Sequence, residues 1–122
     1  MEELLKQKLV ESGVDVEGTL HRFMGNEALF MKFLTKFKSD PNYENLKTSL
    51  DNEDFEAAFR AAHTLKGVSA NLGLTPITQP VSALTELLRG KEASEVDLEQ
   101  VAVQRGALEE AYQGLMRLME ES

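Results

Sequence analysis

The sequence predicts an all-α fold: an antiparallel four-helix bundle with short additional N-terminal helices. Three observations lead to this fold class. Almost every segment repeats its apolar residues at three- and four-residue steps, and no stretch alternates as a β-strand would. Residues 53–72 extend that repeat over about 30 Å of helix. A tight turn at Gly73 then leads directly into another helix, as in a helical hairpin.

Two short helices are expected before the bundle, within residues 2–24. The first covers residues 2–11 and ends near Gly13, because glycine is common just past the end of a helix. The second ends at Gly25 and carries four apolar residues on one side: Val16, Leu20, Phe23 and Met24.

The bundle is expected over about residues 26–120. Asn26 is a typical N-cap for a helix with a broad apolar stripe, formed by Leu29, Phe30, Phe33, Leu34 and Phe37. Asp40 and Pro41 then begin a short helix, as its cap and as a proline at the first helical position. This helix turns three residues inward: Tyr43, Leu46 and Leu50.

The helix over residues 53–72 has one face of apolar and small residues: Phe55, Ala58, Phe59, Ala62, Leu65, Ser69 and Leu72. Gly73 stands where a left-handed C-cap is expected, and Leu74 is placed for the accompanying hydrophobic contact. Thr75 and Pro76 open the next helix at once, which predicts an antiparallel pair.

Two further helices complete the predicted bundle. The first ends around Gly90 and buries Ile77, Val81, Leu84 and Leu88. The last runs from about residue 95 to 120, and its apolar residues follow a near-heptad spacing: Leu98, Val101, Leu108, Ala111, Leu115 and Leu118. The chain shows no internal repeat and no linker, so residues 1–122 are expected to form one domain.

Composition narrows the class of protein. Hydrophobic residues make up 42% and charged residues 28% of the chain, and there is no cysteine, no signal segment and no apolar run of membrane-spanning length. We therefore expect a cytoplasmic protein. The balance of 13 basic to 21 acidic residues argues against nucleic acid or a membrane surface as partner. A monomer is expected, because one bundle uses up the apolar stripes.

The acidic residues are unevenly distributed. None lies between Glu56 and Glu86, whereas Arg60 and Lys66 fall inside that gap. Simple solubility is sufficient to explain the overall acidity, but a surface without carboxylates also suits an anionic group or an acidic partner.

His63 lies about 120° from the centre of the buried face on a helical wheel, so it should face solvent beside the core. Lys66 follows by three residues, where its flexible ammonium can reach a phosphoryl group on the imidazole. Gly67 follows by four, although glycine inside a helix costs about 1 kcal/mol relative to alanine. Close helix packing is one explanation for this glycine. Clearance beside the imidazole is the other, and it is favoured because Gly67 points away from the predicted core.

The run HTLKGVSANLGL from His63 to Leu74 closely resembles the motif of the histidine phosphotransfer (HPt) family, His-x-Leu-Lys-Gly followed by small residues and Leu-Gly. Eight residues fit the motif: His63, Leu65, Lys66, Gly67, Ser69, Ala70, Leu72 and Gly73. VDVEGTLHRFMGNEALFMKFLTKF resembles the segment that leads into the family's bundle. SALTELLR resembles the helix after the motif, with Thr85 where many members carry a glutamate. The resemblance covers nearly the whole chain.

This resemblance implies a phosphorelay carrier rather than an enzyme. His63 would accept a phosphoryl group from the receiver domain of a hybrid histidine kinase and donate it to the receiver aspartate of a response regulator. Lys66 would stabilise the phosphoryl charge, and Gly67 would give steric clearance. The Mg²⁺ would be held by the partner's acidic pocket, so the chain itself needs no cofactor and no metal ligand. Contacts with the partner are expected at Phe59, Arg60, Thr64, Ala70 and Asn71.

Other functions fit the sequence less well. A kinase needs a nucleotide site, and no Gly-rich phosphate loop is present. A phosphoacceptor module excised from a chemotaxis-type or hybrid kinase stays an alternative, although Met1 and the full use of the chain favour a free-standing protein. A di-iron bundle needs paired Glu-x-x-His motifs, which neither His63 nor His21 has. A non-phosphorylated helical interaction domain is the last alternative; loss of His63 or Lys66 would indicate it, and both residues are present.

Overall fold

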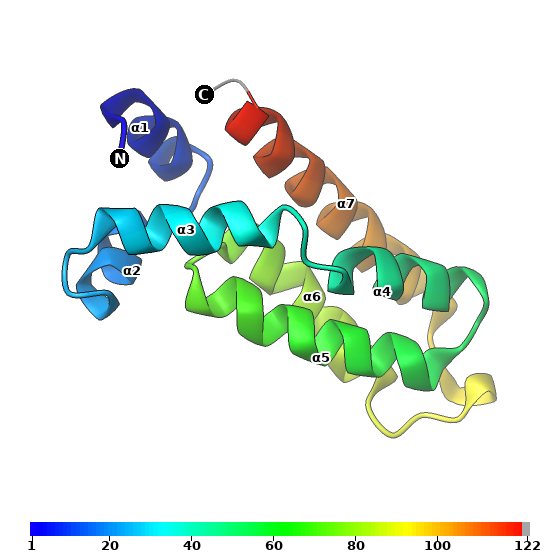
Figure 1. Ribbon diagram of the computed structural model, residues 1–122. Coiled ribbons are helices and arrows are strands. Elements are labelled where there is room, and N and C mark those ends of the chain that lie inside the picture. Colours follow the sequence, from blue (N-terminus) through cyan, green and yellow to red (C-terminus); the bar gives the residue numbers. More distant parts are fainter. Residues whose placement is uncertain (121–122) are drawn as a thin grey trace.

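The computed structural model describes residues 1–120, and every regular element in that range is helical (Figure 1). The elements are α1 (Glu3–Glu11), α2 (Val16–Arg22), α3 (Glu27–Phe37), α4 (Asn42–Asp51), α5 (Phe55–Asn71), α6 (Thr75–Leu88), the 3₁₀ helix η1 (Ala93–Glu95) and α7 (Leu98–Glu120). The predicted all-α fold class is therefore confirmed. None of these helices is both long enough and apolar enough to cross a membrane.

The long helices pack as antiparallel neighbours in chain order. α4 packs along α5, α5 along α6 and α6 along α7, while α3 runs into α4 to extend the same side of the bundle (Figure 1). The last helix closes the bundle against α4. There the rings of Tyr43 and Tyr112 stack with centroids 3.6 Å apart, and Arg105 forms an ion pair with Asp51 at 2.7 Å. The predicted four-helix bundle with short N-terminal helices is thus observed.

The core is one continuous cluster of buried hydrophobic residues to which every α-helix contributes. α2 contributes Val16, from its first turn. Its largest fully buried side chains include Phe30, Phe37, Leu9, Leu34, Leu46, Leu65, Leu74, Ile77, Leu84 and Leu108. Burial of such side chains is the main favourable term in folding. The predicted inward residues of α4 and α6 are all buried, so the helical spacing located these faces correctly.

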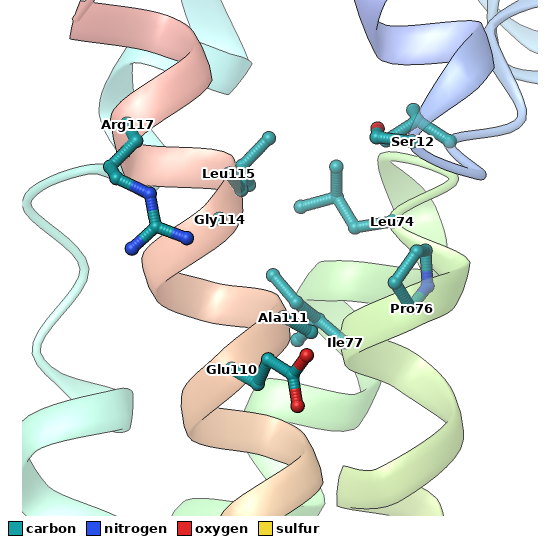
Figure 2. A pocket seen from close by; sticks show the side chains of 10 residues that line it. Ser12, Leu74, Pro76, Ile77, Glu110, Ala111, Gly114, Leu115 and Arg117 are labelled. Carbon is teal, nitrogen blue, oxygen red and sulfur yellow. The ribbon is translucent and has the colours of Figure 1, made fainter.

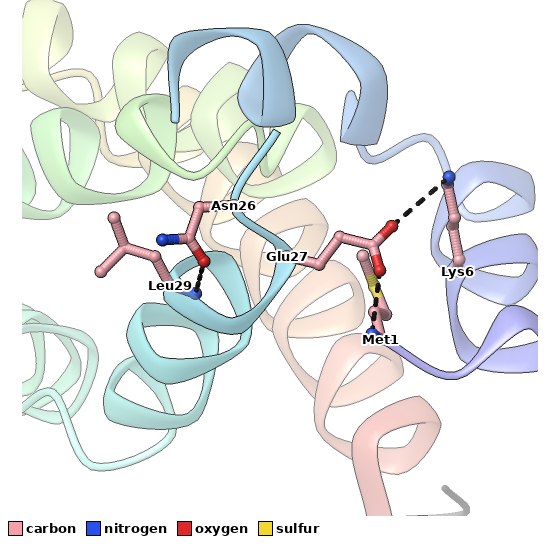
Figure 3. A network of polar contacts seen from close by, with 5 residues as sticks. All are labelled: Met1, Lys6, Asn26, Glu27 and Leu29. Carbon is pink, nitrogen blue, oxygen red and sulfur yellow. Dashed lines mark hydrogen bonds and ion pairs between the residues drawn. The ribbon is translucent and has the colours of Figure 1, made fainter. Parts of the chain in front are cut away.

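Side-chain caps fix where several helices begin. Asn26 accepts a hydrogen bond from the backbone N–H of Leu29 at 2.9 Å, as predicted (Figure 3). Asp54 does the same for Ala57 at 3.2 Å, so α5 begins at Phe55 rather than at residue 53. Pro41 occupies the N-cap of α4, whereas the sequence predicted it at the first helical position, so the helix begins one residue later than expected, at Asn42.

Glu27 at the start of α3 holds the N-terminal helix in place (Figure 3). Its carboxylate accepts a hydrogen bond from the Met1 ammonium at 2.9 Å and lies 3.9 Å from the Lys6 ammonium. The hydrogen bond from Met1 is the main cause that lowers the pKa of Glu27 below its ordinary value. α1 is thereby tied to α3 as well as packed against α7.

The turn between α5 and α6 requires Gly73 for two separate reasons. Its φ of 69° lies in the left-handed region, as the predicted C-cap requires. A β-carbon at this position would also collide with the Thr19 hydroxyl and with the Asp15 carbonyl oxygen, the latter at 2.6 Å. Leu74 behind it is fully buried in the core, as expected for the hydrophobic residue that follows such a cap.

Three apolar residues predicted to lie on inward faces are exposed. Met24 is 95% exposed because α2 ends at Arg22 and Met24 lies in the turn, with a φ of 56°. Leu98 is 56% exposed because α7 begins there, later than the predicted residue 95. Phe33 is 37% exposed at the edge of the α3 stripe, where its ring contacts Phe23 at a centroid distance of 5.9 Å.

The Tyr43 hydroxyl gives a test of this packing, since it is buried and has no hydrogen-bond partner among the described residues. Burial, followed by the charge of Glu109, raises the pKa of Tyr43 to about 12. Tyr43→Phe removes the unsatisfied group, so we expect the free energy of unfolding at pH 7 to rise by about 1 kcal/mol in urea titrations.

The same pKa predicts a pH effect. An unfolded tyrosine ionises at its ordinary pKa of 10.0, whereas folded Tyr43 keeps its proton to about pH 12. The unfolded state therefore binds fewer protons in this window, and the contribution of Tyr43 to stability falls as the pH rises. The Tyr43→Phe variant should lose less stability than the wild type between pH 10 and 12. An equal loss, or a less stable variant at pH 7, would contradict this account.

Candidate functional site

His63 lies in the middle of α5 and is exposed, as the helical wheel predicted. The rotation of α5 follows from its other side, where Ala58, Ala62 and Leu65 are fully buried against the core. Since successive residues of an α-helix are set about 100° apart, these buried positions turn residue 63 outward. The imidazole is therefore accessible to a partner without any movement of the bundle.

Phe59, one turn before His63, supports the imidazole. The two rings are nearly parallel, with an interplanar angle of 11° and centroids 5.8 Å apart. This separation lies in the range of favourable offset stacking. Phe59 is only half-buried, so it belongs to the surface around His63 as well as to the edge of the core in which the sequence placed it.

Lys66 and Gly67 lie one turn beyond His63. The Lys66 side chain is half-buried, with its ammonium close enough to Glu86 to act on the pKa of that carboxyl. Gly67 is exposed, and a β-carbon at this position would meet no atom within 4 Å. Close helix packing therefore does not explain Gly67. The space beside it is open for a group that approaches from outside.

Glu86 on α6 and Arg89, the C-cap of that helix, also belong to this surface, although the sequence did not single them out. Two hydrogen bonds join them: Nε and Nη2 of Arg89 donate to the Glu86 carboxylate at 3.0 and 3.1 Å. The Arg89 guanidinium carbon also lies 5.2 Å from the centroid of the Phe59 ring. Their spacing of three residues near the end of a helix could have predicted the ion pair from the sequence. It could not have predicted that the pair lies beside α5.

The expected face without carboxylates is therefore only partly correct. The pKa of Glu86 lies below its ordinary value, chiefly because Arg89 donates a hydrogen bond to it, and the charges of Arg89, Lys66 and His63 act in the same direction. Glu86 is thus within electrostatic range of His63. The gap in acidic residues along the chain does not persist in space, because α6 brings Glu86 beside α5.

The remaining predicted contact residues are exposed on α5. Arg60 forms an ion pair with Glu56 at 2.8 Å, so its charge is partly neutralised. Thr64 lines a polar groove of about 380 Å³ between α4 and α5, together with Asn42, Asn45, Thr48, Ser49, Ala57, Arg60 and Ala61. Ala70 and Asn71 lie at the end of α5, where their carbonyl oxygens accept hydrogen bonds from Arg22 at 3.3 and 3.0 Å.

A separate apolar pocket of about 310 Å³ lies between the turn before α2, the start of α6 and the C-terminal part of α7 (Figure 2). Leu74, Ile77 and Leu115 supply apolar surface, and Glu110 and Arg117 supply charged groups. None of the residues that surround His63 lines this pocket. The candidate site is an open surface rather than a cavity.

Within residues 1–120, no group of three or more histidine, cysteine, aspartate or glutamate side chains is placed to hold a metal ion. What the surface offers is an accessible imidazole, cationic side chains from two helices and open space beside one turn of α5. These features suit a small anionic group carried on a ring nitrogen.

Residues 36–117 match a family model described as the Hpt domain. The matched range begins at the end of α3, contains the whole of α4, α5 and α6, and reaches almost to the end of α7. The expected likeness of the segment from Val14 to Phe37 lies almost entirely outside this range. No curated protein and no solved structure matches the chain.

The surroundings of Gly67 predict a gain in stability on Gly67→Ala. The new methyl group meets no other atom, while alanine is the better helix former, so the free energy of unfolding should rise by about 1 kcal/mol in urea titrations. Gly73→Ala is the control and should destabilise, because of its positive φ and its contacts with Thr19 and Asp15. Loss of stability in Gly67→Ala would mean that the bundle itself requires this glycine.

Proposed function

This chain belongs to the Hpt domain family, and on that premise we propose that it is a histidine phosphotransfer protein of a two-component phosphorelay. Hpt domains serve in histidine phosphotransfer, exchange phosphoryl groups with receiver domains, and are carriers rather than enzymes. In this chain, His63 accepts the phosphoryl group from a receiver aspartate and passes it to the receiver of a response regulator. The observation that carries the proposal is the exposed His63, followed on the same helix by Lys66 and Gly67, inside the matched range.

The chemistry needs only the imidazole of this chain. The lone pair of Nε2, the ring nitrogen farther from the backbone, attacks the phosphorus of the aspartyl phosphate. The phosphorus–oxygen bond breaks, and the aspartate carboxylate leaves with that electron pair. The reverse set of bond changes delivers the phosphoryl group to the next aspartate. Both steps are in-line displacements, in which positioning and charge stabilisation supply most of the catalysis.

Charge stabilisation is divided between the two proteins. Lys66 lies one turn from His63 and offsets the negative charge of the phosphoryl oxygens. The Mg²⁺ that also neutralises this charge is held by the acidic pocket of the receiver, so this chain binds no cofactor of its own. A flexible ammonium suits this role because it can follow the phosphoryl group as it moves between the two proteins.

The face around His63 is compatible with an acidic receiver pocket. Two carboxylates near His63, Glu56 on α5 and Glu86 on α6, are each paired with an arginine of this chain. Lys66 adds a net positive charge near the centre. Complementary charge of this kind speeds association and fixes orientation. The side chains that touch the receiver are Phe59, Arg60, Thr64, Ala70 and Asn71.

The donor is the receiver domain of a hybrid histidine kinase, and the acceptor is that of a response regulator. The carrier works as a cytoplasmic monomer. Only one receiver at a time can contact His63, because two partners cannot bind the same exposed turn of α5. Donor and acceptor therefore bind in succession at a shared surface.

Phosphoryl uptake tests the assignment of His63. The purified protein is incubated with a panel of ³²P-labelled phosphorylated receiver domains and Mg²⁺. We expect acid-labile label on the wild type, none on His63→Gln, and wild-type label on His21→Gln, since His21 lies on α2 outside the matched range. Equal label on His63→Gln, or no label from any receiver, would contradict the proposed function.

Clearance at Gly67 makes a separate prediction for the rate. Gly67→Ala should slow transfer from a receiver by about tenfold, because the added methyl group occupies space that the docked receiver needs. Gly106→Ala is the matched control: it also adds a methyl group in open space inside a helix, but on α7. Rapid-quench measurements compare the two. Equal rates in both variants would show that clearance at residue 67 does not matter.

A further inference from the structure

Arg89 is placed to act on the group that His63 carries. Its guanidinium and the His63 imidazole both lie against the Phe59 ring, with distances to the ring centroid of 5.2 and 5.8 Å. The backbone leaves the helix at Arg89, which is the C-cap of α6. A long cationic side chain at a helix end, in contact with the same aromatic ring as an exposed imidazole, is a second source of positive charge, independent of Lys66.

In the unphosphorylated protein the Arg89 guanidinium is paired with the Glu86 carboxylate. The pair is exposed, with 50% of the Arg89 side chain and 59% of the Glu86 side chain open to solvent. Exposed ion pairs of this kind contribute little to stability, because water screens the charges and ordering long side chains opposes the gain. The two hydrogen bonds make Glu86 a better partner than most exposed carboxylates, but water screens the pair, so an anion of higher charge can displace Glu86.

A phosphoryl group on His63 is such an anion. It carries nearly two negative charges and three acceptor oxygens, and arginine binds phosphate oxygens through two parallel hydrogen bonds. The Phe59 ring gives the guanidinium a face to rest on before and after the exchange, as cation–π contacts allow. Glu86 already interacts with the charge of His63, so the three groups lie within one electrostatic neighbourhood.

This inference rests on the proposed function. We propose that Arg89 is a second phosphoryl-binding side chain of this carrier. When His63 is phosphorylated, the Arg89 guanidinium releases Glu86 and binds the phosphoryl oxygens instead. Glu86 then competes with the phosphoryl group for the same guanidinium. Arg89 and Glu86 together set how strongly the carrier retains its phosphoryl group: Arg89 favours the phosphorylated state, and Glu86 opposes it.

The first test needs no partner protein. The protein with His21→Gln is treated with phosphoramidate, so that the only histidine left is His63. The nitrogen–phosphorus bond of the reagent breaks, ammonia leaves with the proton that the imidazole gives up, and the new bond joins phosphorus to Nε2. Two-dimensional NMR then follows the Nε–H signals of the arginines. We expect the Arg89 signal to move on phosphorylation while that of Arg105, paired with Asp51 and Glu109, stays in place.

The second test measures the equilibrium between phosphorylated receiver and phosphorylated carrier. Arg89→Gln should lower the phosphorylated fraction of His63 relative to the receiver by about fivefold, and Glu86→Gln should raise it by a similar factor. Arg89→Lys keeps a positive charge and should restore part of the loss. A purely structural role in covering Phe59 predicts that both neutral variants shift the equilibrium in the same direction or leave it unchanged.

The outcomes separate the two proposals. An Arg89 signal that does not move in fully phosphorylated protein, or Arg89→Gln and Glu86→Gln effects of the same sign, would overturn the exchange while the relay function stands. Chemical phosphorylation of His63 with a moved Arg89 signal, but no transfer from any receiver, would support the exchange and overturn the relay function.

Discussion

The structure depends above all on the burial of one face of α5. Ala58, Ala62 and Leu65 are completely excluded from solvent, and Ser69 continues the same face with a hydrogen-bonded hydroxyl. Small side chains let α4 and α6 approach this helix closely, and that approach fixes its rotation about its own axis. The exposure of His63 is a consequence of this fixed rotation. A helix that buried a face one residue away would turn the imidazole by about 100°.

Prediction from the sequence succeeded where a single helix determines the outcome. The apolar spacing within α5 predicted that His63 is exposed, and Gly73 predicted the turn of the hairpin. Both features depend on residues that are close in the chain. Arg89 was missed because helical spacing does not specify which side of α6 meets α5. The stack of Tyr43 on Tyr112 was missed for the same reason, since it joins helices far apart in the sequence.

The apolar stripes predicted from the sequence extend beyond the residues that the helices bury. Met24 and Leu98 fit the helical repeat by position, yet each lies where its helix ends or begins and the backbone no longer holds the side chain over the core. Caps account for the other boundary differences, since Asp54 and Pro41 precede the first helical residue. Periodicity therefore predicts which side of a helix is buried better than it predicts how far that side extends.

The end of α5 nearest Gly73 is braced by residues that precede the matched family range. The Asp15 backbone N–H donates to the Gly73 carbonyl at 2.8 Å, and Arg22 binds the carbonyl oxygens of Ala70 and Asn71. These bonds satisfy acceptors that a helix end leaves open. The fold thus extends beyond the segment that family similarity delimits: a fragment cut at residue 36 would keep α5 with His63 but lose the support of its C-terminal turn.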